Sequence, residues 1–116
     1  MNKNTIFPLL TLVLSFVAFA QSPAAPRIVD LEAADGTPLK ATYFAAKPGP
    51  GVLLLHQVNR TRKSWDHLAS QLAASGINTL TLDMRGIGES GGTRWEKMSH
   101  AERGKLMLVQ LKMCAS

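Results

Sequence analysis

Residues 51–92 decide the fold and read GVLLLHQVNRTRKSWDHLASQLAASGINTLTLDMRGIGESGG. This stretch contains two apolar runs, residues 52–55 and 77–82, separated by a polar loop and a segment with helical periodicity. A strand, a helix and a second strand in this order form a crossover, in which the two strands lie parallel. The stretch therefore predicts a parallel βαβ unit.

The segment between the two apolar runs is predicted to be one amphipathic helix. Ser64 is a good N-cap, and Asp66 lies in the first turn, where a negative charge interacts favourably with the helix dipole. From Trp65 onward, apolar side chains recur at i, i+3, i+4, i+7 and i+8 and form one stripe. Gly76 is typical of the residue that ends a helix in the left-handed conformation.

Outside this unit, the preceding residues predict an antiparallel hairpin. Residues 27–32 alternate weakly, residues 39–44 resume a strand-like pattern, and Asp35-Gly36 between them is a strong turn signal. Residues 47–50, KPGP, then break the chain before the next strand. We therefore expect an α/β fold in which a hairpin leads into the parallel unit.

The N-terminal 20 residues are interpreted as a signal peptide. Lys3 supplies a positive charge, residues 6–20 are mostly apolar, and residues 18–20 (AFA) give the small-x-small cleavage pattern. The apolar run is shorter than the roughly 20 residues that span a bilayer, so no stable membrane span is expected after cleavage. We therefore expect a mature chain that begins at Gln21 and is periplasmic or secreted.

The remaining 96 residues suffice for one small domain, with a linker over residues 21–26 and the domain over 27–116. The chain has a net charge of +5, and loss of Lys3 leaves +4. Its only tight basic cluster, Arg60, Arg62 and Lys63, is interpreted as a solvated loop. A nucleic-acid partner is not expected, because no basic face interleaved with aromatic residues is present.

One cysteine and three histidines limit the metal and redox chemistry of the chain. Cys114 is the single cysteine, so no intrachain disulfide can form. His56, His67 and His100 have no metal-ligand spacing, so no metal site is expected. His67 is interpreted as a solvated or hydrogen-bonded side chain of the helix, and His100 as a residue that caps a helix start or is simply exposed.

The residues that follow the two apolar runs carry a family resemblance. The first run ends at His56-Gln57. The second run is followed by a motif made of Asp83, Arg85, Gly86, Gly88 and Ser90. These features resemble the N-terminal third of the α/β-hydrolase superfamily, in the branch of lysophospholipase-like, serine-aminopeptidase-like and dienelactone-hydrolase-like proteins. In that family the third strand ends in His-Gly and the fourth in Asp-x-Arg-Gly-x-Gly-x-Ser.

The resemblance covers residues 28–92 and implies the N-terminal part of an α/β-hydrolase fold with an incomplete sheet. It also implies a hydrolase of ester, thioester or peptide bonds that uses a serine nucleophile, takes a small-molecule or peptide substrate and needs no cofactor. The signal peptide adds that this hydrolase is exported. The loop of His56, Gln57 and Val58 would supply the backbone N–H of Val58 to an oxyanion hole, with His56 shaping the loop. Gln57 replaces the usual glycine, so it requires a different turn or offers its amide as a donor.

Residues 88–92, GESGG, match the G-x-S-x-G pattern of a nucleophile elbow, with Ser90 as the serine. An elbow needs a strand that runs directly into the first glycine and a helix that starts after the serine. Here Leu82 ends the strand six residues before the first glycine. Ser90 is therefore interpreted as holding turn geometry, as part of a structural strand-end motif. A makeshift triad of Ser90 with His56 and Asp83 is the alternative.

The C-terminal residues predict one helix and no further strand. Ser99 is expected to cap a helix over residues 101–112, and no later elbow, acid or histidine follows. The catalytic serine, acid and histidine are therefore expected outside this chain, which would be inactive alone. We interpret the chain as the front portion of a longer product.

Without a further strand, residues 52–55 would form an unpaired apolar edge, and we expect marginal stability or aggregation. Two other functions stay open. The first is a non-catalytic truncated product. The second is a small exported binding protein that uses residues 60–63 to bind an anionic partner. The sequence carries no prediction of the oligomeric state.

Overall fold

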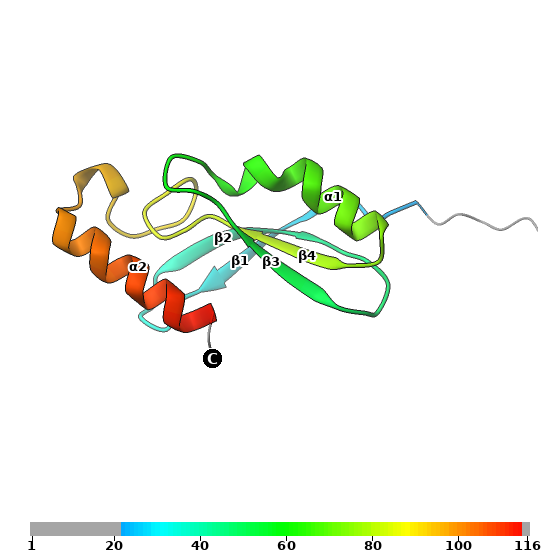
Figure 1. Ribbon diagram of the computed structural model, residues 1–116, viewed down its shortest axis with the longest axis horizontal. Coiled ribbons are helices and arrows are strands. Elements are labelled where there is room, and N and C mark those ends of the chain that lie inside the picture. Colours follow the sequence, from blue (N-terminus) through cyan, green and yellow to red (C-terminus); the bar gives the residue numbers. More distant parts are fainter. Residues whose placement is uncertain (1–21, 115–116) are drawn as a thin grey trace, which may run out of the picture.

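Four strands form one open sheet in the order β1-β2-β4-β3 (Figure 1). The computed structural model describes residues 22–114. The predicted signal peptide and Gln21 lie outside the described residues. The strands are β1 (Arg27–Glu32), β2 (Pro38–Phe44), β3 (Gly51–Leu55) and β4 (Asn78–Leu82).

The first two strands form the predicted antiparallel hairpin. Their register pairs Arg27 with Tyr43 and Glu32 with Pro38. In the connecting turn, the Thr37 N–H donates to the Asp35 carboxylate at 3.1 Å. Gly36 in the same turn has φ +82°, a left-handed conformation that glycine adopts without a steric cost. The sequence prediction of the hairpin is confirmed.

The second half of the sheet contains the predicted parallel crossover. Strands β3 and β4 are parallel and pair Leu53 with Leu80, and helix α1 (Asp66–Ala74) connects them. On its other side β4 pairs antiparallel with β2, with Ala41 opposite Leu82. This mixed sheet confirms the expected α/β architecture of a hairpin that leads into a βαβ unit.

The start of the connecting helix differs from the prediction. A 3₁₀ turn, η1 (Arg62–Trp65), precedes α1, so Ser64 lies inside this turn. Its hydroxyl donates to the Thr61 carbonyl, and Trp65 occupies the cap of α1 without a side-chain bond. The predicted Ser64 N-cap is therefore wrong. The physical reason is tertiary, because the Arg62 N–H is bound by a carboxylate from the end of β4.

The end of α1 agrees with the prediction. Gly76 has φ +89°, and its N–H donates to the Ala73 carbonyl at 3.0 Å. The Ile77 N–H donates to the Leu72 carbonyl, also at 3.0 Å. These two bonds form a Schellman motif, which satisfies the last carbonyls of the helix.

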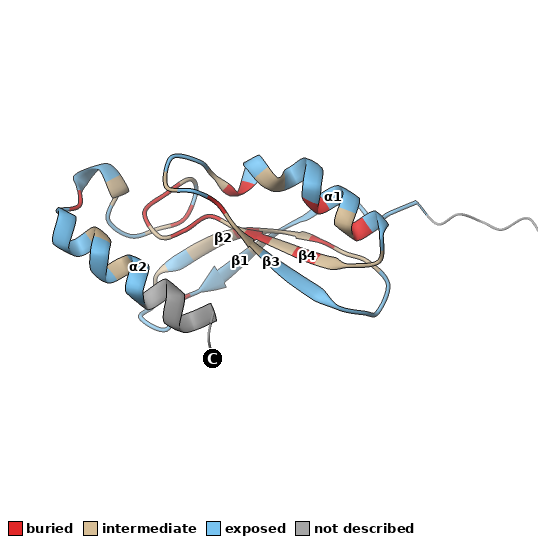
Figure 2. Cartoon of the chain, viewed as in Figure 1, coloured by how far each residue is buried: buried red, intermediate tan, exposed pale blue. Residues whose placement is uncertain are grey.

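The core lies between α1 and one face of the sheet (Figure 2). It consists of Phe44, Ala69 and Ala73, with Leu54 packed against them. Thr79 is fully buried and lies in register with Phe44, so it belongs to the same face. Of the predicted helix stripe, the two alanines are buried.

The sheet is open at β3. Among residues 22–114, β3 has a partner strand on one side only, which is β4. Leu53 in this strand is 45% exposed. The expected incomplete sheet with an apolar edge is therefore present in the described part of the chain.

The C-terminal segment contains a short 3₁₀ turn, η2 (Trp95–Lys97), and the helix α2 (His100–Cys114). Ser99 caps α2 as expected: its N–H and hydroxyl donate to the Glu102 carboxylate at 2.7 Å, and the Glu102 N–H returns to the Ser99 hydroxyl at 3.3 Å. Between residues 22 and 114, no helix has the length and apolar character that a membrane crossing requires.

Candidate functional site

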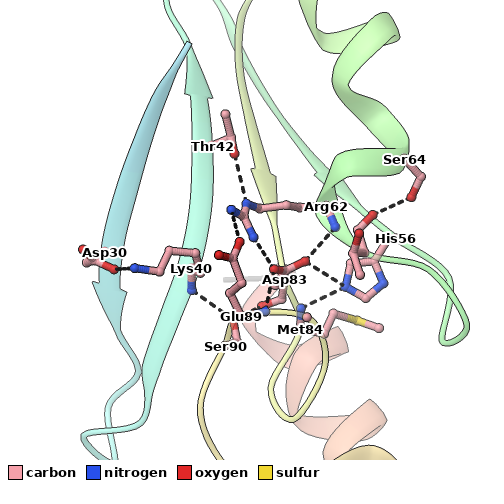
Figure 3. Close-up of polar contacts among 12 residues, drawn as sticks. Asp30, Lys40, Thr42, His56, Arg62, Ser64, Asp83, Met84, Glu89 and Ser90 are labelled. Atoms are coloured by element: carbon pink, nitrogen blue, oxygen red, sulfur yellow. Dashed lines mark hydrogen bonds and ion pairs between the residues drawn. The ribbon is translucent and has the colours of Figure 1, made fainter.

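The carboxyl ends of β3 and β4 bring together the two residues that the sequence placed there. His56 directly follows β3 and Asp83 directly follows β4, and the two strands are in register at Leu55 and Leu82. The His56 Nε2 lies 4.0 Å from an Asp83 carboxylate oxygen, and both side chains are fully buried (Figure 3). Ligand groups of open α/β sheets collect at this edge.

His56 holds the loop that it begins. Its Nε2 accepts a hydrogen bond from the Met84 N–H at 3.0 Å, and its Nδ1 lies 2.7 Å from the Gln57 carbonyl. Because a backbone N–H only donates and a carbonyl only accepts, the proton of the neutral ring lies on Nδ1. Both ring nitrogens are therefore engaged by the backbone, and His56 has no free nitrogen to act as a base.

Gln57 occupies the position where the resembled family has glycine. Its carbonyl also accepts the Arg60 N–H at 2.9 Å, which closes a turn over residues 57–60. Among the described residues, no side-chain-bearing residue has a positive φ, so Gln57 fits without backbone strain. This turn makes glycine unnecessary at position 57.

Asp83 receives hydrogen bonds from two loops. Its Oδ1 accepts the Arg62 N–H at 2.7 Å, and its Oδ2 accepts the Glu89 N–H at 3.0 Å and forms an ion pair with the Arg62 guanidinium. Burial alone would raise the pKa of Asp83, but these hydrogen bonds and the positive charge outweigh it and lower the pKa below its usual value. Asp83 is therefore a buried carboxylate anion.

Arg62 corrects the prediction that residues 60–63 form a solvated loop. Its side chain is 1% exposed, and its Nε donates to the Thr42 hydroxyl at 3.0 Å. Its guanidinium lies between Asp83 and Glu89, with a Glu89 carboxylate oxygen at 2.5 Å. Burial acts to lower the pKa of Arg62, but the two carboxylates raise it overall. Only Arg60 and Lys63 of the basic cluster are exposed.

The two inner glycines of the strand-end motif have separate structural reasons. Gly88 has φ +57°, and a Cβ at this position would overlap the Asp83 carboxyl group. Gly86 has φ +75°, and a Cβ there would overlap the Thr93 carbonyl oxygen. Glycine at position 88 lets the loop approach the Asp83 carboxylate, and glycine at position 86 lets the two ends of the loop meet.

Arg85 connects the motif to the first hairpin. Its guanidinium forms an ion pair with Asp35 and donates to the Thr37 hydroxyl at 2.8 Å. The hydrogen bond from Arg85 is the main reason that the pKa of Asp35 lies well below its usual range. The loop after β4 is thereby attached to the turn between β1 and β2.

Ser90 is buried and its hydroxyl bonds to the backbone on both sides. Its Oγ donates to the Asp83 carbonyl at 2.5 Å and accepts the Lys40 N–H at 2.9 Å. A nucleophilic serine would instead donate to a histidine. The structure therefore does not bring Ser90, His56 and Asp83 together as a proton relay.

A cavity of about 390 Å³ lies beside this cluster, at the carboxyl ends of β3 and β4. The loop residues His56, Gln57 and Val58 form part of its wall. No acceptor among the described residues bonds the Val58 N–H. This edge of the sheet therefore combines a loop held by backbone bonds, a Val58 N–H without an acceptor among the described residues, and a cavity that Val58 lines.

The other histidines lie apart from this cluster. His67 on α1 and His100 at the start of α2 are both exposed. Within residues 22–114, no group of three or more histidine, cysteine or carboxylate residues has the arrangement to hold a metal ion.

Sequence reasoning did not find the ion cluster of Arg62, Asp83 and Glu89. Arg62 and Asp83 are 21 residues apart, and no helical or strand periodicity links them. The one available signal was Asp83 itself, because a carboxylate that follows a buried strand requires a donor or a cation.

The sheet order, the crossover and the strand-end motif define an α/β-hydrolase fold. The profile of a family described as serine aminopeptidase, S33, matches residues 46–103, half of the chain. The chain belongs to this family.

Solved structures are similar to the chain in the same region. An epoxide hydrolase from an endophytic Streptomyces matches at 28% identity and a TM-score of 0.53, over 58% of this chain and 19% of its own. The thioesterase domain from the curacin biosynthetic pathway matches at 26% identity and a TM-score of 0.53, over 59% of this chain and 24% of its own.

A Pseudomonas aeruginosa protein classed with the epoxide hydrolases matches at 25% identity and a TM-score of 0.56, over 78% of this chain and 29% of its own. The chain therefore spans less than a third of the length of each of these structures.

Proposed function

We propose that this chain supplies the oxyanion loop of an exported serine hydrolase that acts on ester, thioester or peptide bonds. In this proposal the catalytic serine, acid and histidine come from outside residues 1–116, and the chain alone is inactive. Membership of a hydrolase family supports the reaction class.

The observation that carries the proposal is the free N–H of Val58 beside the cavity. An oxyanion hole needs donors that are fixed before the reaction, so that they do not reorganise as charge develops on the substrate oxygen. The two bonds of the His56 ring and the turn closed by the Gln57 carbonyl fix the loop that carries this N–H. The loop that carries this donor is thereby fixed, and Val58 is among the residues that line the cavity.

A nucleophile outside the chain is supported by the bonds of the two candidate residues within it. The Ser90 hydroxyl donates to a backbone carbonyl, and both His56 nitrogens have backbone partners. Activation of either residue would first break these buried bonds, each of which costs about 1–3 kcal/mol when one partner is left unsatisfied.

The first experiment exposes the chain to a fluorophosphonate probe, which labels activated serines. We expect no labelling of the purified chain. The coding sequence beyond codon 116 is then read and its product expressed, and we expect labelling at a serine beyond residue 116. Labelling of Ser90 would contradict the proposal. Absence of any labelled serine in the longer product would favour the non-catalytic alternative.

The second experiment tests the role of Val58 in that longer product. Val58→Pro removes the N–H and is expected to lower kcat by about 10²–10³-fold, as for loss of one oxyanion donor. Val58→Ala keeps the N–H and serves as the matched control, with kcat within a few-fold of the parent. Equal kcat for the two variants, with unchanged circular dichroism, would remove Val58 from the mechanism.

Export is supported by the signal-peptide pattern of residues 1–20. Its test is N-terminal sequencing of the protein recovered from the periplasm or the culture medium, where we expect Gln21 as the first residue. Recovery of the chain in the cytoplasm with its first residues intact would contradict export.

The anion-binding alternative has less support. It relied on a basic loop of three cations, and the Arg62 guanidinium is buried between two carboxylates. Arg60 and Lys63 alone are left to face solvent, and two exposed cations are a weak basis for selective anion binding.

A further inference from the structure

The turn between β1 and β2 contains the pair Asp35-Gly36, whereas the other three aspartates of the chain precede leucine, histidine and methionine. Both residues of the pair are exposed, and the Asp35 side chain is 58% exposed. Glycine has no Cβ, so its backbone nitrogen is the least hindered one that can follow an aspartate. Asp35 is therefore the aspartate whose carboxyl group the backbone can attack most easily.

Such an attack isomerises the peptide bond. The Gly36 nitrogen bonds to the Asp35 Cγ, a carboxyl oxygen leaves as water with the amide proton and the carboxyl proton, and a succinimide ring forms. Water then adds to the main-chain carbonyl carbon of Asp35 and breaks its bond to the Gly36 nitrogen. The chain now runs through the former side-chain carboxyl group, as isoaspartate, and the mass of the protein is unchanged.

The Asp35 carboxyl group is held by two partners that oppose this reaction. The Arg85 guanidinium forms an ion pair with Oδ2, and its second terminal nitrogen donates to Oδ1 at 3.0 Å. The Thr37 N–H also donates to Oδ1, at 3.1 Å. The hydrogen bond from Arg85 is the largest reason that the pKa of Asp35 lies well below its usual range. Because a carboxylate anion is a poor electrophile, these contacts slow attack at Cγ.

The attacking nitrogen is also engaged. The Gly36 N–H donates to the Ala33 carbonyl at 2.8 Å, and the Ala33 N–H donates to the Thr37 carbonyl at 2.9 Å. Ala33 is buried, so its carbonyl would lose a partner in a sheltered place when the Gly36 nitrogen turned toward the carboxyl group. The folded turn therefore holds both reacting groups in other bonds.

Arg85 links the state of this turn to the loop after β4. Its guanidinium also donates to the Thr37 hydroxyl at 2.8 Å. A Cβ at Gly92 would overlap the Arg85 Cγ, so the loop packs closely on the arginine stem. Movement of the loop after β4 would thus withdraw the cation from Asp35.

We propose that Asp35-Gly36 is a latent site of aspartate isomerisation, that Arg85 keeps it in the ordinary linkage, and that isoaspartate at position 35 detaches the β1–β2 turn from the loop after β4. The reaction adds a methylene group to the main chain of the turn and places the free carboxylate on a different carbon, so the paired contact with the guanidinium is lost. It requires water and no nucleophilic serine, and is therefore independent of the hydrolase reaction.

The experiment incubates the purified chain at pH 7 and 37 °C and digests samples with the protease Asp-N, which cleaves before aspartate but not before isoaspartate. Loss of cleavage at Asp35 without a change in mass, with cleavage kept at Asp30 and Asp66, measures the conversion. Arg85→Gln removes the cation. Arg60→Gln is the matched control, because it removes an exposed arginine from another loop.

We expect Arg85→Gln to convert about three- to fivefold faster than the parent, as for loss of a well-aligned exposed ion pair, and Arg60→Gln to convert at the parent rate. The parent unfolded in concentrated urea should convert at least about tenfold faster than the folded parent, because the bonds of the turn are then absent. In the same urea, Gly36→Ala should convert more slowly than the parent, since its Cβ hinders the nitrogen.

A second measurement uses the parent alone and decides the role of the ion pair even when Arg85→Gln does not fold. Raising NaCl to about 1 M screens an exposed pair and should speed conversion of the folded parent, with no such effect on the urea-unfolded chain. After conversion, hydrogen exchange over residues 85–92 should be faster than before it.

Equal rates for folded Arg85→Gln and Arg60→Gln, or a salt-independent rate in the folded parent, would overturn the role of Arg85. A folded parent that converts as fast as the urea-unfolded chain would show that the turn gives no protection. Unchanged hydrogen exchange over residues 85–92 after conversion would overturn the detachment of the loop.

Discussion

The Arg62 guanidinium is buried against the Asp83 carboxylate at the end of β4, and the Arg62 backbone N–H binds the same carboxyl group. Arg62 thus binds the same partner through both its side-chain charge and its backbone N–H. The start of the 3₁₀ turn η1 and the end of β4 are joined through this pair.

Removal of Arg62 is expected to leave a buried carboxylate without its cation. Arg62→Ala should lower the free energy of unfolding by about 3–5 kcal/mol. Arg60→Ala removes an exposed arginine from the same loop and should change it by less than about 0.5 kcal/mol. Urea denaturation followed by circular dichroism measures both. Similar losses for the two variants would show that the buried pair is not stabilising.

Gly88→Ala tests the close approach of the loop to Asp83. The left-handed backbone alone costs a side-chain-bearing residue about 1–2 kcal/mol, and overlap with the carboxyl group adds about 1–3 kcal/mol. Gly36→Ala is the control for backbone strain, because its φ is also positive but its Cβ would meet open space. The thermal unfolding midpoint should fall more for Gly88→Ala than for Gly36→Ala, and equal falls would rule out the overlap.

Stability is expected to fall as the pH drops below about 5. The pKa of Asp83 is lower in the folded state than the value of about 3.9 of an unfolded chain. The unfolded state therefore binds protons first, and the contribution of Asp83, complete above the unfolded pKa, is lost as the pH falls through the folded pKa. Urea midpoints between pH 7 and pH 3 measure this loss.

The matched variants for this pH dependence are Asp83→Asn and Asp35→Asn. Asp83→Asn should be less stable than the parent at pH 7, and the difference should narrow below pH 4. The Asp35 carboxyl also has a lowered pKa but is exposed. Asp35→Asn should therefore reduce the pH dependence of the free energy of unfolding less than Asp83→Asn does. A constant difference between parent and Asp83→Asn at every pH would contradict this explanation.

The open edge of β3 is expected to cause self-association. Residues 48–59 carry no aspartate, glutamate, lysine or arginine, so no such charge opposes pairing of this strand with another chain. Leu53→Lys should shift the chain toward the monomer in size-exclusion chromatography with light scattering. Leu108→Lys removes a leucine of α2 that is still more exposed, at 63%, and should not shift this equilibrium. Equal effects would attribute association to general surface hydrophobicity.

Ser90→Ala is expected to affect stability and not catalysis. The change leaves the Asp83 carbonyl and the Lys40 N–H without their partner, which costs about 1–3 kcal/mol. Ester hydrolysis by the longer product should keep its kcat, since the nucleophile is expected elsewhere. A loss of kcat larger than tenfold, in protein that is still folded, would contradict this prediction and indicate that Ser90 takes part in catalysis.

The architecture was predictable from the sequence because its signals are local. The apolar run that ends at Leu55, the helix stripe from Trp65 and the glycine at 76 each depend on neighbours within one element. Topology then follows, since a single helix between two strands forces them to be parallel. The same reasoning placed His56 and Asp83 at one edge of the sheet.

The details of the site were not predictable because they depend on distant partners. Ser64 looked like a helix cap, but Asp83 takes the Arg62 N–H, and a tighter turn forms instead. The sequence likewise predicted a solvated Arg62 side chain, because its partners Asp83 and Glu89 are distant in the sequence. Contacts between loops that follow different strands leave no periodic trace in the sequence.

The Asp83 carboxylate also limits which substitutions this protein can accept during evolution. The loops that contain Arg62 and Glu89 both donate to it, and Gly88 lies directly beside it. A change in the path of one loop therefore displaces the carboxylate that holds the other. A descendant that lost the carboxylate would have to replace the arginine and reshape the 88–89 step together. The loops that follow β3 and β4 are therefore expected to tolerate substitution only when both are replaced together.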